Sequence, residues 1–333
     1  MIRTLLAAAV LAAPIAHADP VQVSGPYVLN RDLEPGDSYM GVEYQGALKL
    51  EAVEIDGHLL GGLSALSYDA DEGVLYALSD GGTVFEMALQ HDESGYLHKV
   101  EVRRAFALRD STGQPLKGRR ADSEGLTLRN AANGVPGDSE LVVSFERRPR
   151  VLRFTAQGKL LGAVALPARL RDTKLYVTSN RGLETLAWHP RLGHLTAIEQ
   201  PFRGTTDGTV ELHALDSGRH WRYPLANEPN AGLTDAVVLD DGSLLTLERG
   251  FGLFFVPFIS TLRRVPSLPD TDGAILQVET VVRLNTGQGW SLDNFEGLAL
   301  LDRDRVVIVS DDNRRALQST LLAQFKLLPR TPN

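Results

Sequence analysis

A hairpin motif recurs five times along the chain, and this repeat is the feature that most constrains the fold. The first strands of the copies begin at residues 64, 124, 184, 235 and 296, so successive copies start 60, 60, 51 and 61 residues apart. A polar turn and a second short apolar run follow each first strand, as at residues 141–145 and 305–309. A near-constant period with several strands per copy is typical of a β-propeller, whose blades bury their faces only against neighbouring blades.

The two ends of the chain decide the number of blades. Residues 19–64 and the stretch from residue 296 to residue 333 together contain about five strand-like segments, including 47–55 and 321–328. That number suits one blade closed by a strand from the N-terminal part of the chain. We therefore predict an all-β fold, a single β-propeller of four-stranded blades, with five blades favoured and six as the alternative.

The first eighteen residues have the pattern of a secretory signal. Arg3 supplies a positive charge, an alanine-rich apolar stretch follows over residues 5–15, and Ala16-His17-Ala18 forms a cleavage site of the small-x-small type. The apolar stretch is too short to span a bilayer. We expect residues 1–18 to be cleaved as a signal peptide, leaving residues 19–333 as one propeller domain of a periplasmic or secreted protein without a membrane anchor.

Composition excludes several classes of function. The chain contains no cysteine, which removes thiol catalysis and thiolate metal sites. Its formal net charge of −8 argues against nucleic acid and anionic membranes as partners, and is compatible with the binding of metal cations. We expect a monomer whose partner is a small anionic or ester substrate.

Acidic residues occupy corresponding positions in the repeated hairpins. The start of the first strand carries one set, and the end of the second strand carries another. The first set is Ser64, Glu124, Glu184, Asp235 and Glu296, and the second set is Asp80, Glu146, Glu199, Glu248 and Asp311. The first strands of propeller blades line the central axis and the second strands run antiparallel to them, so both sets are expected to surround one central mouth.

Carboxylates clustered in this way repel one another and require protons, basic partners or bound cations. Oxygen ligands without cysteine favour a hard cation, and calcium more than magnesium. The sequence therefore predicts a calcium site built from Asp80, Glu124, Glu146, Glu184, Glu199, Asp235, Glu248, Glu296 and Asp311. Structural ion pairing is the alternative, because arginines such as Arg147, Arg249 and Arg314 accompany the acids.

Five short motifs occur in a fixed order along the chain. They are Leu78-Ser79-Asp80-Gly81, Ser123-Glu124-Gly125-Leu126, Phe145-Glu146-Arg147, Leu247-Glu248-Arg249 and Phe295-Glu296-Gly297-Leu298. In this order and spacing the sequence resembles, over residues 61–327, the phytase-like exported proteins described as "esterase-like activity of phytase". The resemblance implies a β-propeller and calcium-dependent hydrolysis of phosphate or other esters.

Two functions follow from these observations. The first is a metal-dependent hydrolase of phosphoric esters, carboxylic esters or lactones, with Glu124, Glu296, Arg147 and Arg249 as catalytic candidates. In this hydrolase the arginines would stabilise the charge that develops on the substrate. The second is a non-catalytic propeller that binds a ligand or a partner at the same mouth and uses calcium for structure.

Overall fold

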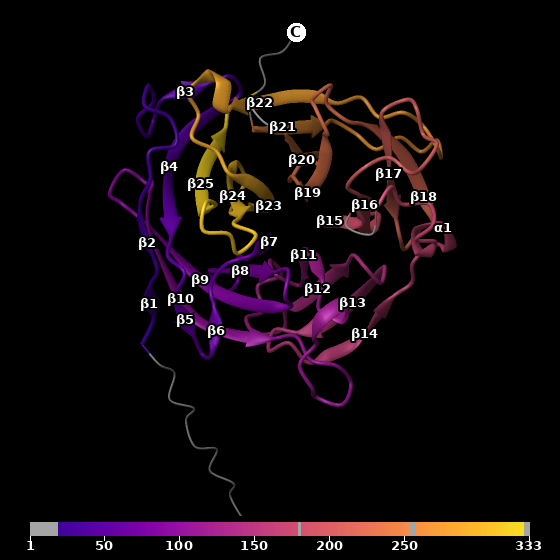
Figure 1. Ribbon diagram of the computed structural model, residues 1–333, viewed down its shortest axis with the longest axis horizontal. Coiled ribbons are helices and arrows are strands. Elements are labelled where there is room, and N and C mark those ends of the chain that lie inside the picture. The colour runs from indigo at the N-terminus through magenta and orange to yellow at the C-terminus, as the bar shows by residue number, and fades with distance from the viewer. Residues whose placement is uncertain (1–18, 179–180, 253–257, 330–333) are drawn as a thin grey trace, which may run out of the picture.

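Antiparallel sheets surround a central axis in the computed structural model, which describes residues 19–178, 181–252 and 258–329 (Figure 1). The predicted signal peptide, residues 1–18, lies outside the described residues. Among the described residues, no helix is long and apolar enough to cross a membrane. The regular structure is almost entirely strand, and α1 (Ala168–Arg171) is a single helical turn.

Five sheets form the blades, each running outward from a first strand at the axis. Blade 1 is β7 (Leu63–Asp69), β8 (Val74–Ser79), β9 (Thr83–His91) and β10 (Leu97–Ala107), extended by β1 (Val21–Gln22). Blade 2 is β11 (Ser123–Arg129), β12 (Glu140–Phe145), β13 (Arg150–Thr155) and β14 (Leu160–Val164). Blade 3 is β15 (Leu183–His189), β16 (Gly193–Ile198), β17 (Thr209–Ala214) and β18 (Arg219–Pro224). Blade 4 is β19 (Gly232–Val238), β20 (Leu244–Gly250), β21 (Ile259–Val265) and β22 (Glu279–Asn285).

The fifth blade joins the two ends of the described chain. Its strands β23 (Asn294–Leu300), β24 (Arg305–Asp311) and β25 (Thr320–Leu327) come from the C-terminal part, and β4 (Val42–Leu50) comes from the N-terminal part. β4 pairs antiparallel with β25, placing Leu48 opposite Leu322, and also carries the short strands β2 (Ser24–Pro26) and β3 (Ser38–Tyr39). The predicted closure by an N-terminal strand is confirmed, and so is the count of five blades.

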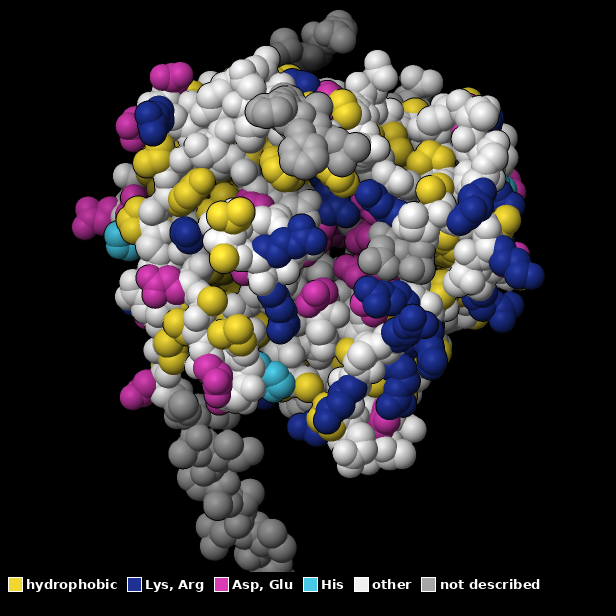
Figure 2. All heavy atoms as spheres, viewed as in Figure 1, with side chains coloured by type: hydrophobic (Ala, Val, Ile, Leu, Met, Phe, Trp, Pro, Cys, Tyr) yellow, Lys and Arg dark blue, Asp and Glu magenta, His cyan; other side chains and the backbone are white. Residues whose placement is uncertain are grey.

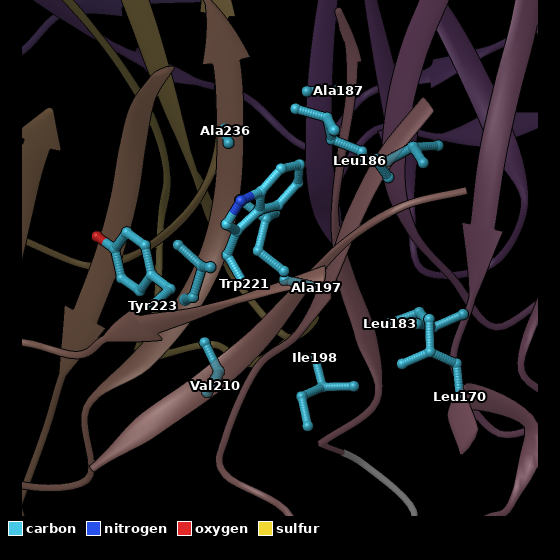
Figure 3. Close-up of a cluster of buried hydrophobic side chains, with 14 of the residues drawn as sticks. Leu170, Leu183, Leu186, Ala187, Ala197, Ile198, Val210, Trp221, Tyr223 and Ala236 are labelled. Atoms are coloured by element: carbon cyan, nitrogen blue, oxygen red, sulfur yellow. The ribbon is translucent and has the colours of Figure 1, made fainter. Parts of the chain in front are cut away.

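Apolar side chains fill the spaces between blades, because each sheet is apolar on both faces. One cluster joins blades 2, 3 and 4 through Val151, Leu212, Trp221 and Ala236. Figure 3 shows Trp221 and Ala236 within this cluster. The Trp221 ring is fully buried, and its indole N–H donates to the carbonyl oxygen of Pro269 at 2.8 Å. Packing between blades holds the five first strands side by side around the axis, which brings their starts together.

Candidate functional site

Every first strand is irregular at one corresponding point near its start. The pairing with the second strand shifts between Leu63 and Ala65 in β7, and the other four first strands show the same shift. The residues at the shifted position are Ser64, Glu124, Glu184, Thr234 and Glu296. A β-bulge re-aims a side chain, and bulges are frequent beside active sites. These five residues therefore form the inner ring of the mouth.

The predicted inner ring was wrong by one residue in blade 4. Thr234 stands at the position of Glu184 and Glu296, and Asp235 is the next residue, opposite Leu247. The Asp235 carboxylate accepts hydrogen bonds from the backbone N–H groups of Ala236 and Leu298, both at 2.8 Å. Burial raises its pKa well above the usual range. Asp235 thus links the first strands of blades 4 and 5.

The second ring needs the same correction in blade 4. Asp80, Glu146, Glu199 and Asp311 each follow or end a second strand at corresponding positions, and Arg249 occupies that position in β20. Glu248 lies on the other face of β20. Its carboxylate accepts from the Tyr223 hydroxyl at 2.5 Å and pairs with Arg263 at 2.7 Å. Glu248 therefore belongs to the packing between blades 3 and 4, and a cation takes its expected place in the ring.

Three carboxylates at the mouth end of blade 2 lie close together. One oxygen from each of Asp122, Glu124 and Glu146 lies within 4.8 Å of the other two. Glu124 and Glu146 belong to the two predicted sets, whereas sequence analysis missed Asp122. The alternation Asp122-Ser123-Glu124 carried the signal, because residues two apart in an extended segment face the same side. We call these three residues the acidic triad.

The acids of the mouth bind protons unusually tightly. The pKa of Glu146 is raised to about 8, first by burial and then by the charges of nearby Asp122 and Glu199, while a hydrogen bond from the Gly182 N–H acts in the opposite direction. Burial also raises the pKa of Asp311 to about 8. The pKa values of Glu124 and Glu184 lie well above the usual range, first because both are buried and then because each faces several other acids. The acids of the mouth are therefore more stable when they are protonated or bound to a cation than as free carboxylates.

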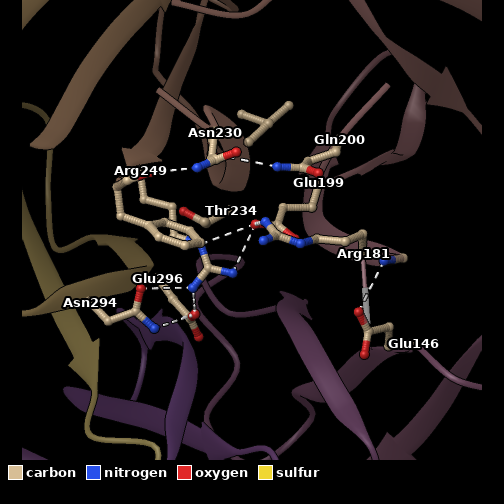
Figure 4. A network of polar contacts seen from close by, with 12 residues as sticks. Glu146, Arg181, Glu199, Gln200, Asn230, Thr234, Arg249, Asn294 and Glu296 are labelled. Atoms are coloured by element: carbon tan, nitrogen blue, oxygen red, sulfur yellow. Dashed lines mark hydrogen bonds and ion pairs between the residues drawn. The ribbon is translucent and has the colours of Figure 1, made fainter. Parts of the chain in front are cut away.

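A buried ion network crosses the mouth from blade 3 to blade 5 (Figure 4). The Arg249 guanidinium donates through Nε and Nη2 to Glu199 Oε1 at 3.1 and 2.8 Å. Its Nη1 donates to Asn294 Oδ1 at 2.7 Å and to Glu296 Oε1. Arg181 adds a second cation, with its Nη1 2.7 Å from Glu199 Oε1. In this part of the mouth the acids are paired with arginines, as the alternative of structural ion pairing predicts.

An aromatic ring covers this network. The guanidinium carbons of Arg181 and Arg249 lie 5.4 and 5.9 Å from the centre of the Phe251 ring. Such cation–π contacts keep the guanidinium groups in place and restrict their access to water. Arg249 is thus held by three polar partners and an aromatic cover. This favours a role in positioning its neighbours over direct binding of substrate.

Two other arginines at the mouth are more accessible. The Arg147 side chain is 39% exposed and its Nε lies 3.0 Å from Asp122 Oδ2 in the acidic triad. The Arg314 side chain is 50% exposed and pairs with Asp80 at 3.7 Å. Figure 2 shows acidic side chains in the central hollow and basic side chains around it. Arg147 and Arg314 can therefore turn toward an anion without breaking a buried network.

Several buried polar atoms of the mouth lack a partner. Ser64 Oγ and Glu199 Oε2 have no hydrogen-bond partner among the described residues. Buried polar groups normally find partners, so the mouth has the character of a binding site. Hard oxygen ligands of this kind suit calcium, and the acidic triad, with Asp80 nearby, is the group best placed to hold it.

The raised pKa values predict how stability depends on pH in a chelator. Glu146 and Asp311 titrate near pH 8 in the native protein and near 4.5 and 3.8 when unperturbed. Between these values the native state binds more protons than the unfolded state, so the free energy of unfolding falls as pH rises from about 5 to about 8. Urea denaturation in a chelator at pH 5, 6, 7 and 8 measures this trend. Stability that is flat or rises over this window contradicts it.

Comparisons with known proteins bear on the same residues. The family model "Phytase-like: Esterase-like activity of phytase" matches residues 58–314. No curated protein matches the sequence. Among solved structures, the PQQ-bound form of aldose sugar dehydrogenase from Streptomyces coelicolor is similar at 12% sequence identity and a TM-score of 0.39. The match covers 84% of this chain and 97% of that chain. A likeness at this level carries no argument about the site.

Proposed function

The chain belongs to the phytase-like family described as "esterase-like activity of phytase", and on this premise we propose that it is a metal-dependent hydrolase of phosphate or other esters. The acidic triad carries this proposal. Asp122, Glu124 and Glu146 bring three oxygens within 4.8 Å of one another, and Arg147 stands beside them. Carboxylates for a cation next to an accessible arginine are what the cleavage of an anionic ester requires.

The residues of the mouth would have different roles in this reaction. Asp122, Glu124 and Glu146 would hold calcium, which when bound supplies Lewis-acid polarisation of an ester oxygen. Arg147 binds and orients the anionic group, and its guanidinium stabilises negative charge that develops there. Glu296 and Arg249 hold the far side of the mouth in shape through Asn294 and Glu199.

Export to the periplasm or the medium, after removal of residues 1–18, completes the proposal. We propose that the mature protein is a monomer and that its substrate is a small ester. The surrounding medium would supply the calcium. The other candidate is a propeller that binds a ligand or partner at this mouth without catalysis, and the buried pairs of Arg249 with Glu199 and Glu296 favour it.

An activity panel separates the two candidates. Purified mature protein is assayed against generic phosphate esters, carboxylate esters and a sugar lactone, in calcium and in EDTA. The hydrolase predicts turnover in calcium that is lost in EDTA and restored by excess calcium. If calcium raises the melting temperature but no ester is turned over, the hydrolase proposal fails and the binding propeller stands. If calcium changes neither quantity, both fail.

A further inference from the structure

The outermost strand of blade 2 has an edge that no described segment covers. This strand, β14 (Leu160–Val164), pairs with β13 alone. Among the described residues, none outside β13 forms a backbone hydrogen bond with residues 160–164. A parallel bridge joins Arg109 to Lys159, just before the strand begins. One row of N–H and C=O groups therefore faces outward without a partner. We call this side of residues 160–164 the β14 edge.

The outer edges of the other four blades are covered. Blade 1 carries the two-residue strand β1, and β4 of blade 5 carries the short strands β2 and β3. In blade 3, residues 273–276 lie along β18, and the Arg222 N–H donates to the Ala274 carbonyl oxygen at 2.9 Å. In blade 4, the Gly41 N–H donates to the Val281 carbonyl oxygen of β22 at 2.9 Å. Proteins usually cover or shorten sheet edges because an open edge pairs with other chains, so β14 is the exception.

β14 also lacks the side chains that keep an edge strand from pairing. Its five residues, Leu160-Leu161-Gly162-Ala163-Val164, include no charged residue and no proline. Leu161 is 47% exposed, and Ala163 is exposed as well. Charges and prolines are the usual means by which proteins block an edge. Five residues of strand extend over about 17 Å, which is long enough to pair with another extended segment.

The surroundings of the β14 edge are basic. Residues 156–171 include no acid and three bases, Lys159, Arg169 and Arg171, in a chain whose net charge is −8. Arg169 pairs with Glu211, whereas Lys159, Arg171 and the bridging Arg109 form no ion pair with any described residue. Figure 2 shows basic side chains over the part of the molecule that β13, β14 and α1 occupy in Figure 1. Acidic residues in a partner would complement these charges.

We infer that the β14 edge binds an extended segment of another protein, which adds a strand to blade 2. The segment has apolar residues in alternation where it pairs with β14, and acidic residues on either side. Main-chain hydrogen bonds supply the affinity in this mode of recognition, and alternate side chains supply the specificity. A second copy of β14 fits less well, because pairing two such edges brings their basic surroundings together. This inference does not rest on the proposed hydrolase activity.

A synthetic peptide with the sequence Glu-Val-Thr-Val-Thr-Val-Glu, blocked at both ends and labelled with a fluorophore, serves as the probe. Fluorescence anisotropy measures its binding to the mature protein in EDTA, so that no metal at the mouth can hold its acids. We expect saturable binding, and weaker binding of the peptide that has lysine in place of both glutamates. The difference should vanish in 1 M salt, which screens charges beyond about 3 Å. No binding of the acidic peptide overturns the inference, and equal binding of the two peptides at low salt overturns the acidic partner.

Methylation of the peptide backbone distinguishes strand addition from other modes of binding. Along a paired strand, only alternate residues direct their N–H groups toward the neighbouring strand. One peptide is therefore N-methylated on its valines, and another on its threonines. We expect one pattern to abolish binding and the other to leave it intact. Loss of binding with both patterns, or with neither, overturns strand addition.

Replacement of Leu161 by glutamate tests the edge on the protein itself. Leu161→Glu is expected to weaken binding of the acidic peptide by about 5-fold, because the variant loses an apolar contact across the strands and gains a like charge. The matched control is Val135→Glu in the loop between β11 and β12, where Val135 is 53% exposed, and it is expected to leave binding unchanged. Circular dichroism checks that both variants fold. Equal binding by Leu161→Glu and the parent overturns the inference.

Sedimentation velocity separates a partner segment from a second copy of the chain. The mature protein is expected to sediment as a monomer, in keeping with an edge reserved for another protein. A dimer that Leu161→Glu dissociates, with Val135→Glu still dimeric, would assign the β14 edge to self-association and overturn the partner segment.

Discussion

Replacing Arg249 by methionine is expected to lower the free energy of unfolding by about 3–5 kcal/mol, because it leaves buried carboxylates without their cation. Arg249 pairs with Glu199 at 2.8 Å and also with Glu296, and both acids are buried. Loss of the guanidinium removes the contact that joins blades 3, 4 and 5 at the mouth. Urea denaturation of the variant and of the parent protein in the same buffer measures the loss.

Two further variants distinguish this network from a general effect of lost charge. Arg147→Met removes an arginine from the same mouth whose side chain is 39% exposed, and it is expected to cost only about 0–1 kcal/mol. Adding Glu199→Gln and Glu296→Gln to Arg249→Met should recover part of the lost stability, since the unpaired charges are then absent. Equal losses for Arg249→Met and Arg147→Met would contradict the network as a determinant of stability.

Neutralising the acidic triad is expected to have effects of opposite sign on metal binding and on metal-free stability. Glu124→Gln and Asp122→Asn should each weaken calcium binding by at least about 100-fold, since even residues that only support metal ligands contribute up to that factor. In EDTA, Glu124→Gln should raise the melting temperature, because it removes a buried carboxylate that faces Glu146 and Glu296. Calorimetric titration with calcium and thermal denaturation in EDTA measure the two effects.

A matched control separates the triad from acidity in general. Glu93→Gln changes an exposed acid in the turn between β9 and β10, and both quantities are expected to stay at the parental value. In the parent, calcium at 100 times its Kd should stabilise the fold by about 2.7 kcal/mol, and the triad variants should lose this gain. A Glu124→Gln variant that keeps the calcium response would remove the triad from the proposed site.

The repeat of hairpins was sufficient to predict the architecture. Each hairpin is a local feature in which an apolar run, a turn and a second run lie close in sequence, so its signal survives without knowledge of the rest of the chain. The period then implied blades that bury their faces against one another. The closing strand could also be predicted, because the segment around Leu48 needed a strand to pair with and only the last blade was one strand short.

The same reasoning could not predict the register of the strands in blade 4. Thr234-Asp235 and Glu248-Arg249 each place an acid beside the position that faces the mouth, and the pattern of acids favoured the acid in both pairs. A shift of one residue turns a side chain to the other face of a sheet. The bulge between Leu233 and Asp235 sets which residue faces the mouth, and hydrogen bonds to the next blade hold Asp235 there.

The sequence by itself determined that this chain repeats a strand hairpin five times and carries acids near the corresponding ends of the strands. Only the tertiary structure decided which side chains meet. Arg249 contacts Glu199 and Glu296, which are 50 and 47 residues away in the chain, and Asp122 joins Glu124 and Glu146 across two strands. The physical reason is that packing between blades sets these distances, and no local preference of the chain encodes them. The ring of carboxylates that the repeat predicted is thus an acidic triad on one side and a neutralised ion network on the other.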